Sequence, residues 1–429
     1  MLSALDRRHT VAPPGYSRWL IPPAALAIHL CIGQVYATSV YKNSLIAHFD
    51  TGQTAIGVIF SIATGQLWLL YLGYGVLGGI GLGIGYISPV STLIKWFPDR
   101  PGLATGLAIM GFGGGAMVAS PLSRQLLSFY DPAYDPANSG STASGPALVW
   151  LFVTLGVGYF VIMMFGVFNV RVPAPDWRPA GFDPARVADK PLVTTANVSA
   201  ANAVRTRSFW LLWVVLFCNV TAGIGILEQA SPMIQDFFRE GGTSAVSVAA
   251  AGGFVGLLSL FNMAGRFVWS STSDVIGRKP IYMVYLGVGM VLYLLLALVG
   301  QTATALFVLL ACVILSFYGG GFATVPAYLR DLFGTFEVGA IHGRLLTAWS
   351  AAGVAGPLIV NAFLDAQGEP GTLTAAAYRP ALFTMVGVLA VGLVANLLVR
   401  PVPQRYHEPA SGRDETEPGQ PVTAERSGS

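Results

Sequence analysis

The chain has 429 residues, of which 54% are hydrophobic and only 10% are charged, and its formal net charge is +3. Its basic residues gather in short segments between apolar runs of about 20 residues, the length that crosses ~30 Å of hydrocarbon. This pattern predicts an all-α, polytopic membrane protein, and it is not the pattern of a nucleic-acid-binding protein.

The apolar runs divide the chain into five regions. A cytosolic N-terminal segment is expected at 1–18, followed by an N-terminal helical bundle at 19–170, a proline-containing cytosolic linker at 171–208, a C-terminal helical bundle at 209–400 and a disordered cytosolic tail at 401–429. The runs themselves lie at 19–41, 54–95, 102–123, 147–170, 209–231, 246–270, 280–300, 303–329, 341–363 and 379–400.

The second run, 54–95, is long enough for two crossings, because about 40 helical residues would span ~60 Å. Two crossings would place the basic segment KWFPDR (95–100) outside, against the positive-inside rule. We therefore predict one crossing at 68–93, preceded by an apolar stub at 54–66 that lies along or partly in the bilayer. Ten full crossings result.

Basic segments predict the orientation of these crossings. KWFPDR, the linker, IGRK (276–279) and HGR (342–344) all fall on one side, which the positive-inside rule assigns to the cytosol. The opposite loops, 124–146 and 364–378, are poor in Lys. We expect a multi-pass protein of the inner (plasma) membrane with both termini in the cytosol.

Arg266 is the best pointer to function, because it is the one Arg or Lys that lies deep within an apolar run. A guanidinium stays charged, so at membrane depth it needs an anion or a wet cavity. Asn262 lies four residues earlier and shares its helix face. A transported carboxylate would supply the anion, and the amide could bind a further oxygen. A structural ion pair and a side chain that snorkels to the interface are the alternatives.

Several blocks of sequence carry a resemblance to a known family. The turn SDVIGRK (273–279) is similar to the repeated cytosolic motif of the major facilitator superfamily, in which an acid, a Gly and two basic residues latch helix ends together. The superfamily has a two-bundle fold of twelve helices. Longer blocks resemble the oxalate/formate antiporter (OFA) family, which also contains monocarboxylate transporters; they lie at 21–40, 85–106, 225–232, 318–334 and 342–357. The latch residues here are Asp274, Gly277, Arg278 and Lys279.

One departure from the family concerns the N-terminal bundle. In the family, the stretch that here reads TAIGVIFSIA continues through the rest of helix 2, a basic turn and helix 3. Here Ala63 is followed almost at once by Gln66 and Leu67. Most of the helix 2–helix 3 hairpin is therefore missing, in agreement with ten crossings, and transport competence becomes an open question.

The resemblance also implies residues that line a substrate cavity. Tyr328 and Tyr86 lie in blocks that contribute aromatic rings to the family's cavity, and Gln34 and Tyr36 on the first helix fit the same role; packing or interfacial anchoring is the alternative for each. Where an oxalate-type carrier has a second cation, this chain has Ala352. One cation balances one carboxylate, so a monoanion such as formate, lactate or acetate is favoured over oxalate.

Three titratable residues bear on the coupling of transport. Glu228 could carry a co-transported proton, although a solvated position near the outer helix end is at least as well supported. His29 could titrate near neutral pH, with a satisfied core histidine as the alternative. His342 is expected at the membrane interface. Anion exchange and proton symport both remain open.

Other classes of function find little support. No metal, disulfide or catalytic constellation is visible, and the glycine runs GGIGLGIG (78–85) and GFGGG (111–115) suit close helix crossings rather than dinucleotide binding. We expect a monomer that uses no cofactor. Its expected partners are a small carboxylate substrate, the lipid bilayer and, under proton symport, protons. The alternatives are an oxalate/formate exchanger and a transport-defective or sensing relative.

Overall fold

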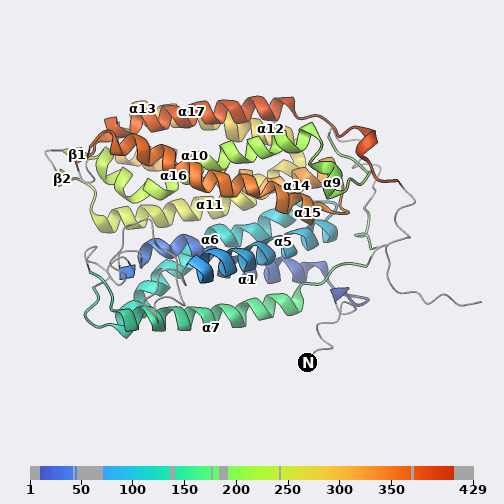
Figure 1. The fold of residues 1–429 in the computed structure, drawn as a ribbon, viewed down its shortest axis with the longest axis horizontal. Helices are drawn as coiled ribbons and strands as arrows, with labels where there is room; N and C mark the ends of the chain where they lie inside the picture. Colours follow the sequence, from blue (N-terminus) through green and yellow to red (C-terminus); the bar gives the residue numbers. More distant parts are fainter. Residues whose placement is uncertain are drawn as a thin grey trace, which may run out of the picture.

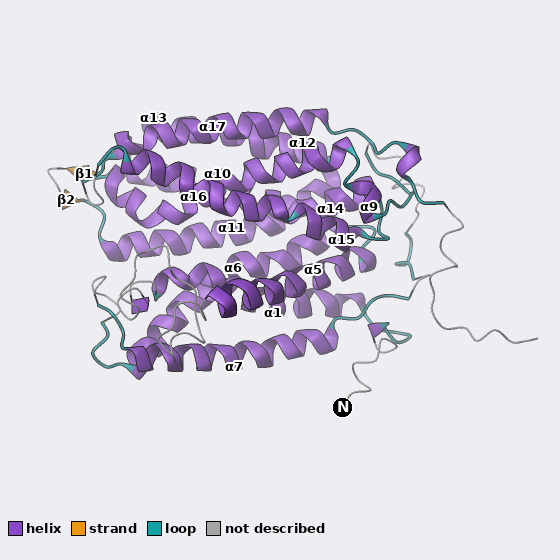
Figure 2. Cartoon of the chain, in the orientation of Figure 1, coloured by secondary structure: helices purple, strands orange, loops and turns teal. Residues whose placement is uncertain are grey.

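The computed structural model describes residues 10–41, 44–45, 71–135, 141–174, 177–182, 192–240, 243–368 and 372–409. Long helices run side by side, with the N-terminal helices on one side of the bundle and the C-terminal helices on the other (Figure 1). Two short strands lie at one end of the bundle, and helices form nearly all the rest (Figure 2). The stub at 54–66 and the tail from 410 lie outside the described residues.

The N-terminal half consists of three long helices and several shorter ones. Its elements are η3 (Arg18–Leu20), α1 (Ile21–Ile32), η4 (Gly33–Val40), η6 (Tyr71–Gly78), α5 (Gly79–Trp96), α6 (Pro101–Tyr130) and α7 (Gly145–Asn169). The segment between 171 and 199 carries no helix in its described part.

The C-terminal half begins at a short helix and contains most of the long ones. Its elements are α9 (Ala200–Ala203), α10 (Arg207–Phe237), β1 (Arg239–Glu240), β2 (Thr243–Ser244), α11 (Val248–Ile276), α12 (Arg278–Met283), η7 (Val284–Val288), α13 (Gly289–Val299), η8 (Gly300–Thr302), α14 (Thr304–Phe333), α15 (Val338–Leu345), α16 (Thr347–Asp365), α17 (Ala375–Leu398) and η9 (Gln404–Tyr406). The strands pair antiparallel.

Nine helices in the described part of the chain are long and apolar enough to cross a membrane. The apolar helix Arg18–Ile32 is shorter, and η4 continues it to Val40. The prediction of an all-α, multi-pass membrane protein is confirmed. The second apolar run, 54–95, contains one such helix, Val76–Trp96, within its described residues.

Short turns join several helices at one end of the bundle, which we call the basic end. α5 and α6 are joined there by residues 97–100, and α11 and α12 by Gly277. Gly277 has φ +93° and Gly334, after α14, has φ +80°, conformations that glycine adopts without strain. Thr206 caps the start of α10 by accepting a hydrogen bond from the Phe209 amide.

The two halves meet where α6 packs along α11, with α14 against both. Glycines allow this close approach. A Cβ added at Gly102 would lie 2.2 Å from the Ser270 carbonyl oxygen, and one at Gly106 would lie 2.8 Å from the Arg266 carbonyl oxygen. Helices that touch backbone to backbone fix the positions of the side chains between them with little freedom.

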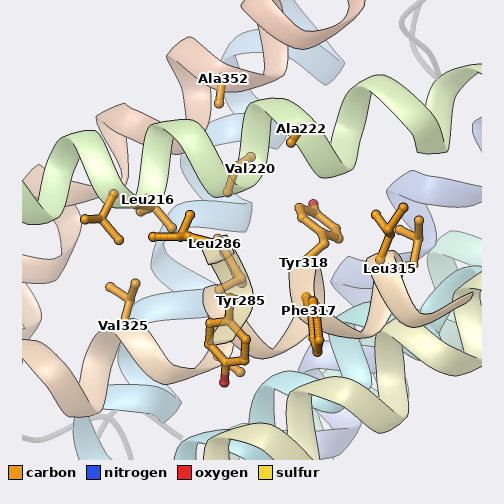
Figure 3. Close-up of a cluster of buried hydrophobic side chains, with 14 of the residues drawn as sticks. Leu216, Val220, Ala222, Tyr285, Leu286, Leu315, Phe317, Tyr318, Val325 and Ala352 are labelled. Atoms are coloured by element: carbon orange, nitrogen blue, oxygen red, sulfur yellow. The ribbon is translucent and has the colours of Figure 1, made fainter. Parts of the chain in front are cut away.

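The C-terminal half has an apolar core between α10, α14, α16 and the segment η7 (Figure 3). Leu216, Val220, Leu286 and Tyr318 belong to it. Ala352 on α16 is fully buried and belongs to the same cluster (Figure 3). The position that the resemblance aligns with a second cation is therefore occupied by a small side chain within apolar packing.

Two glycines of α11 make a matched test of this packing. A Cβ at Gly265 would lie 2.2 Å from the Ser316 carbonyl oxygen of α14, and backbone cannot move aside cheaply, whereas nothing lies within 4 Å of a Cβ at Gly253. Gly265→Ala is expected to destabilise the protein by about 1–3 kcal/mol or more, and Gly253→Ala to cause no loss. Thermal unfolding of the two purified variants measures the difference. Equal melting temperatures would contradict the observed helix contact.

Candidate functional site

Arg266 lies in the middle of α11, at the junction of α11 with α6 and α14, and only 1% of it is exposed. Its Nε donates to Asn262 Oδ1 at 3.0 Å, and its Nη1 donates to the Ile109 carbonyl oxygen of α6 at 3.4 Å. No Asp or Glu among the described residues forms an ion pair with it. The guanidinium is thus held by neutral acceptors, and its charge is not compensated by a described side chain.

Two aromatic rings cover the guanidinium. Its Cζ lies 5.4 Å from the ring centre of Phe112 on α6 and 5.0 Å from that of Phe322 on α14. The two rings are stacked at 6.4 Å, and Trp349 on α16 packs against both, at 6.1 Å and 5.8 Å. Cation–π contacts contribute about 0.5–2 kcal/mol each and leave the net charge unchanged. The cation is therefore oriented by its surroundings without being neutralised.

Tyr86 on α5 extends this cluster toward two histidines. Its ring lies 6.0 Å from Phe112 and 5.5 Å from Phe322, and on its other sides it contacts His29 of α1 at 5.4 Å and His342 of α15 at 5.6 Å. His342 is only 2% exposed and therefore packs inside the bundle, while its expected position at the membrane interface stays a prediction.

The other residues expected in the site lie elsewhere. Gln34 accepts a hydrogen bond from the Tyr41 hydroxyl at 3.3 Å, on η4 and the residue that follows it. Tyr36 lies in η4, and its side chain is outside the described residues. Tyr328 packs against Tyr282 at 5.7 Å and donates to Asn396 at 3.5 Å, near the basic end. The structure therefore brings Tyr86 and Asn262 to Arg266 but not Gln34 or Tyr328.

A cavity of about 1400 Å³ opens at the end opposite the basic end. α6 contributes Ser120 and Arg124 to its wall, and α10 contributes Glu228, which is exposed there. Ser259 of α11 also lines it, and Arg266 lies about 10 Å further along the same helix by the rise per residue. The cavity thus leads from one end of the bundle between the two halves toward Arg266.

At the basic end a network of charged side chains holds the two halves together. Asp274 accepts hydrogen bonds from the Gly102 and Leu103 amides, at 2.9 Å and 2.8 Å, and so caps the start of α6. Arg278 binds Asp274 at 2.6 Å and Asp331 of α14 at 2.9 Å. These contacts link α6, α11 and α14 at this end.

Two further side chains complete the network. Lys279 donates to the Leu397 and Val399 carbonyl oxygens at the end of α17. Arg330 binds Asp331 at 3.0 Å and donates to the Pro98 carbonyl oxygen at 3.3 Å. Pro98 belongs to the N-terminal half, so Arg330 forms a second link between the halves.

Comparison with known proteins identifies the family to which this chain belongs. The profile of the Major Facilitator Superfamily matches residues 51–357. The chain belongs to this superfamily. Among solved structures, the E. coli fucose:proton symporter matches with a TM-score of 0.53 at 13% identity, over 89% of this chain and 84% of that one. A bacterial homologue of the lysosomal transporter Spinster matches with a TM-score of 0.51 at 16% identity, over 91% and 100%. Both likenesses concern the fold alone.

Curated superfamily relatives include carriers of small carboxylates. The chain is 25% identical to the oxalate:formate antiporter of Oxalobacter formigenes over 306 residues, 71% of this chain and 64% of that one. It is 26% identical to apicoplast pyruvate carrier 1 of Toxoplasma gondii over 379 residues, 77% and 67%. The match therefore covers less than two thirds of the antiporter's length. The chain is thus a superfamily member that has an oxalate:formate antiporter and a pyruvate carrier among its relatives.

Sequence reasoning missed four members of the cluster: Phe112, Phe322, Trp349 and His342. Phe112 lies within GFGGG, and Phe322 follows three glycines in GGGF. A single large ring among glycines is a usable signal, because glycines bring helices together and the ring is then forced between them. The position of His342 carried no such signal.

Asn262 offers a prediction about the charge of the site. Asn262→Asp would place a carboxylate within hydrogen-bond distance of the Arg266 guanidinium and so neutralise it internally. A carboxylate that binds the guanidinium would then lose at least about tenfold in affinity, which corresponds to ~1.4 kcal/mol. Equilibrium binding of labelled lactate to purified protein measures it. Asn262→Ser, an uncharged change, is the control and should bind several-fold more tightly than Asn262→Asp; equal affinities would contradict an uncompensated guanidinium.

Proposed function

We propose that the protein is a secondary transporter of short monocarboxylates, such as formate, lactate or acetate, that works by alternating access. The observation that carries this proposal is Arg266, a buried cation that no described acid neutralises. A buried charge without a partner is costly, so a carboxylate that enters the site gains both a charge-assisted hydrogen bond and release from that cost.

The number of cations supports a monoanion. One guanidinium balances one carboxylate, and Ala352 offers no second positive charge in the apolar core around it. A dianion bound in the same surroundings would keep one charge unpaired in a medium of low polarity. The oxalate:formate exchanger remains the alternative substrate assignment.

The two ends of the path support alternating access. The cavity reaches toward Arg266 from one end, while Asp274, Arg278 and Arg330 close the basic end. If the basic end faces the cytosol, as its Lys and Arg residues favour, the described state is open to the outside of an inner membrane. If the two halves rocked against each other, the basic end would open and the anion would be carried across the membrane.

Exchange follows from the same charge. Without an anion, a closed site would hold the guanidinium unpaired, so reorientation of the empty carrier should be slow. Proton symport is the competing version, with Glu228 or His29 as the proton carrier. The exposed position of Glu228 in the cavity wall favours a solvated role for that residue. No catalytic step is assigned, and a monomer suffices for this mechanism.

Counterflow of labelled formate and lactate into proteoliposomes tests the proposal. Uptake should require a carboxylate inside the liposomes if exchange is correct, and it should alkalinise the medium if symport is correct. If neither acid enters under any condition, the result would favour the interpretation that the protein is a relative that does not transport. The interpretation as a relative that does not transport has one specific support. The described N-terminal half contributes three helices long enough to span a membrane, whereas the described C-terminal half contributes six.

A further inference from the structure

A second cavity, of about 600 Å³, lies at the basic end and shares no lining residue with the cavity at the opposite end. Its wall comes from both halves of the bundle. Pro98 and Pro101 belong to the turn before α6, while the turn 276–280 joins α11 to α12. Val399 and Arg400 follow α17. A cavity of this size accommodates a small ligand or a lipid headgroup.

The three carboxylates that line this cavity are already paired. Asp99 binds Arg18 at 2.8 Å. Asp274 binds Arg278 at 2.6 Å, and Asp331 binds the same guanidinium at 2.9 Å. Their negative charges are therefore compensated within the protein, and any further cation in the wall makes the local potential positive.

Two such cations, Lys279 and Arg400, line the cavity without a carboxylate partner among the described residues. The Lys279 ammonium donates to the Leu397 and Val399 carbonyl oxygens, at 2.7 Å and 3.0 Å, and a lysine has one donor more than these two bonds use. Arg400 is exposed and follows Val399 directly in the chain. The contact with Val399 therefore brings the ammonium next to the residue that carries the guanidinium, and the two cations can share one phosphate group.

Exposed apolar side chains adjoin these cations. Val275 is 85% exposed, Ile276 46% and Met283 43%, and all three line the cavity. The helices on either side, Ala250–Ile276 and Arg278–Thr302, are both long and apolar enough to cross a membrane, so the turn between them lies at a membrane surface. A soluble anion gains nothing from apolar side chains. A phospholipid presents its phosphate to the cations and its acyl chains to the apolar side chains.

We propose that this cavity binds one anionic phospholipid, whose phosphate is held by Lys279 and Arg400. The site exists whether or not Arg266 binds a carboxylate. Pro98 and Pro101 complete its wall from the N-terminal half, so the site is complete only while the two halves are joined at the basic end. A ligand that binds one state of the bundle shifts the population toward that state, and the lipid therefore opposes opening of this end.

Titration of the purified full-length protein with phosphatidylglycerol or phosphatidylcholine, followed by native mass spectrometry, tests the site. One phosphatidylglycerol molecule should be retained at least about fivefold more tightly than phosphatidylcholine, because a Lys or Arg near a membrane surface favours an anionic lipid by about that factor. A large excess of inorganic phosphate should not displace the lipid.

Variants assign the lipid to the two cations. Arg400→Gln and Lys279→Gln should each weaken phosphatidylglycerol binding by about fivefold and leave phosphatidylcholine binding unchanged. Arg400 is exposed, so its substitution tests the site without disturbing the packing of the fold. Arg205→Gln removes an exposed cation that does not line the cavity and is the matched control, which should bind within about twofold of wild type.

Hydrogen exchange of the protein in nanodiscs measures the effect on the basic end. The Gly102 and Leu103 amides donate to Asp274 across the junction of the halves, so they exchange when that junction opens. With about 20 mol% phosphatidylglycerol they should exchange at least about fivefold more slowly than with phosphatidylcholine alone. This difference should be lost in Arg400→Gln.

Each outcome bears on one part of the inference. Equal affinity for the two lipids, or an equal loss of affinity in Arg205→Gln, would overturn the lipid site. Displacement by inorganic phosphate would assign the cavity to a soluble anion instead. Selective lipid binding with unchanged exchange at Gly102 and Leu103 would overturn the effect on opening. A failure of carboxylate counterflow would count against the function proposed for Arg266 and would leave the lipid site standing.

Discussion

Arg266→Gln is expected to lower the rate of carboxylate counterflow at limiting substrate by about 100-fold or more. Removing one partner from a buried, hydrogen-bonded charge pair typically costs 2–5 kcal/mol, and ~2.7 kcal/mol corresponds to 100-fold. The glutamine amide can still form a hydrogen bond with the Asn262 side chain. We therefore expect the loss of transport rate to come from the missing positive charge and bidentate contact rather than from repacking. Initial rates of labelled lactate counterflow in proteoliposomes measure it.

Two controls sharpen this prediction. Arg205→Gln removes an exposed cation at the basic end and should leave the rate within about twofold. Arg266→Lys keeps the charge but loses the bidentate fork, so it should fall between wild type and Arg266→Gln. A glutamine variant that transports like the Arg205 control would mean that the anion is bound elsewhere.

Arg278→Gln is expected to cause the largest loss of stability, about 3–5 kcal/mol. Arg278 is only 8% exposed and binds two carboxylates, Asp274 and Asp331, and also the Ser273 hydroxyl. Without it, Asp274 keeps its hydrogen bonds to the start of α6 but loses its ion pair with Arg278, and Asp331 loses one of its two ion pairs. Thermal unfolding of purified protein should show the effect.

The neighbouring residue provides the control for this variant. Lys279 is paired with carbonyl oxygens at the end of α17 rather than with a carboxylate. Lys279→Gln leaves no buried acid unpaired, so its loss should be small, about 1 kcal/mol or less. Equal destabilisation by the two variants would show that the buried carboxylates do not depend on Arg278.

Much of the architecture could be predicted from the sequence, because membrane spans are specified by length and hydropathy alone. The run 280–300 became α12, η7 and α13, and the run 303–329 became α14, each within a few residues. The pairing of Arg266 with Asn262 was also predictable, since residues four apart on a helix share a face. The helix spans and the Arg266–Asn262 contact both depend on residues that are close in the sequence.

Contacts between distant segments were harder to predict. Nothing in the sequence around Tyr328 says that its ring faces Tyr282 rather than Arg266, because that depends on how α14 is rotated against α11 and α12. The contact of His342 with Tyr86 joins two helices that are far apart in the sequence, and the residues beside His342 give no sign of it. Such contacts follow from how helices are rotated against one another, which hydropathy does not encode.

The position of a bound anion would show most directly whether Arg266 binds the substrate. A crystal structure of the protein with dichloroacetate, a monocarboxylate that carries anomalous scatterers, would locate it. We expect chlorine peaks between the two halves beside Phe112 and Phe322, with the carboxylate within hydrogen-bond distance of the Arg266 guanidinium. A fully occupied peak elsewhere along the path, with Arg266 still bound only to Asn262 and Ile109, would contradict it.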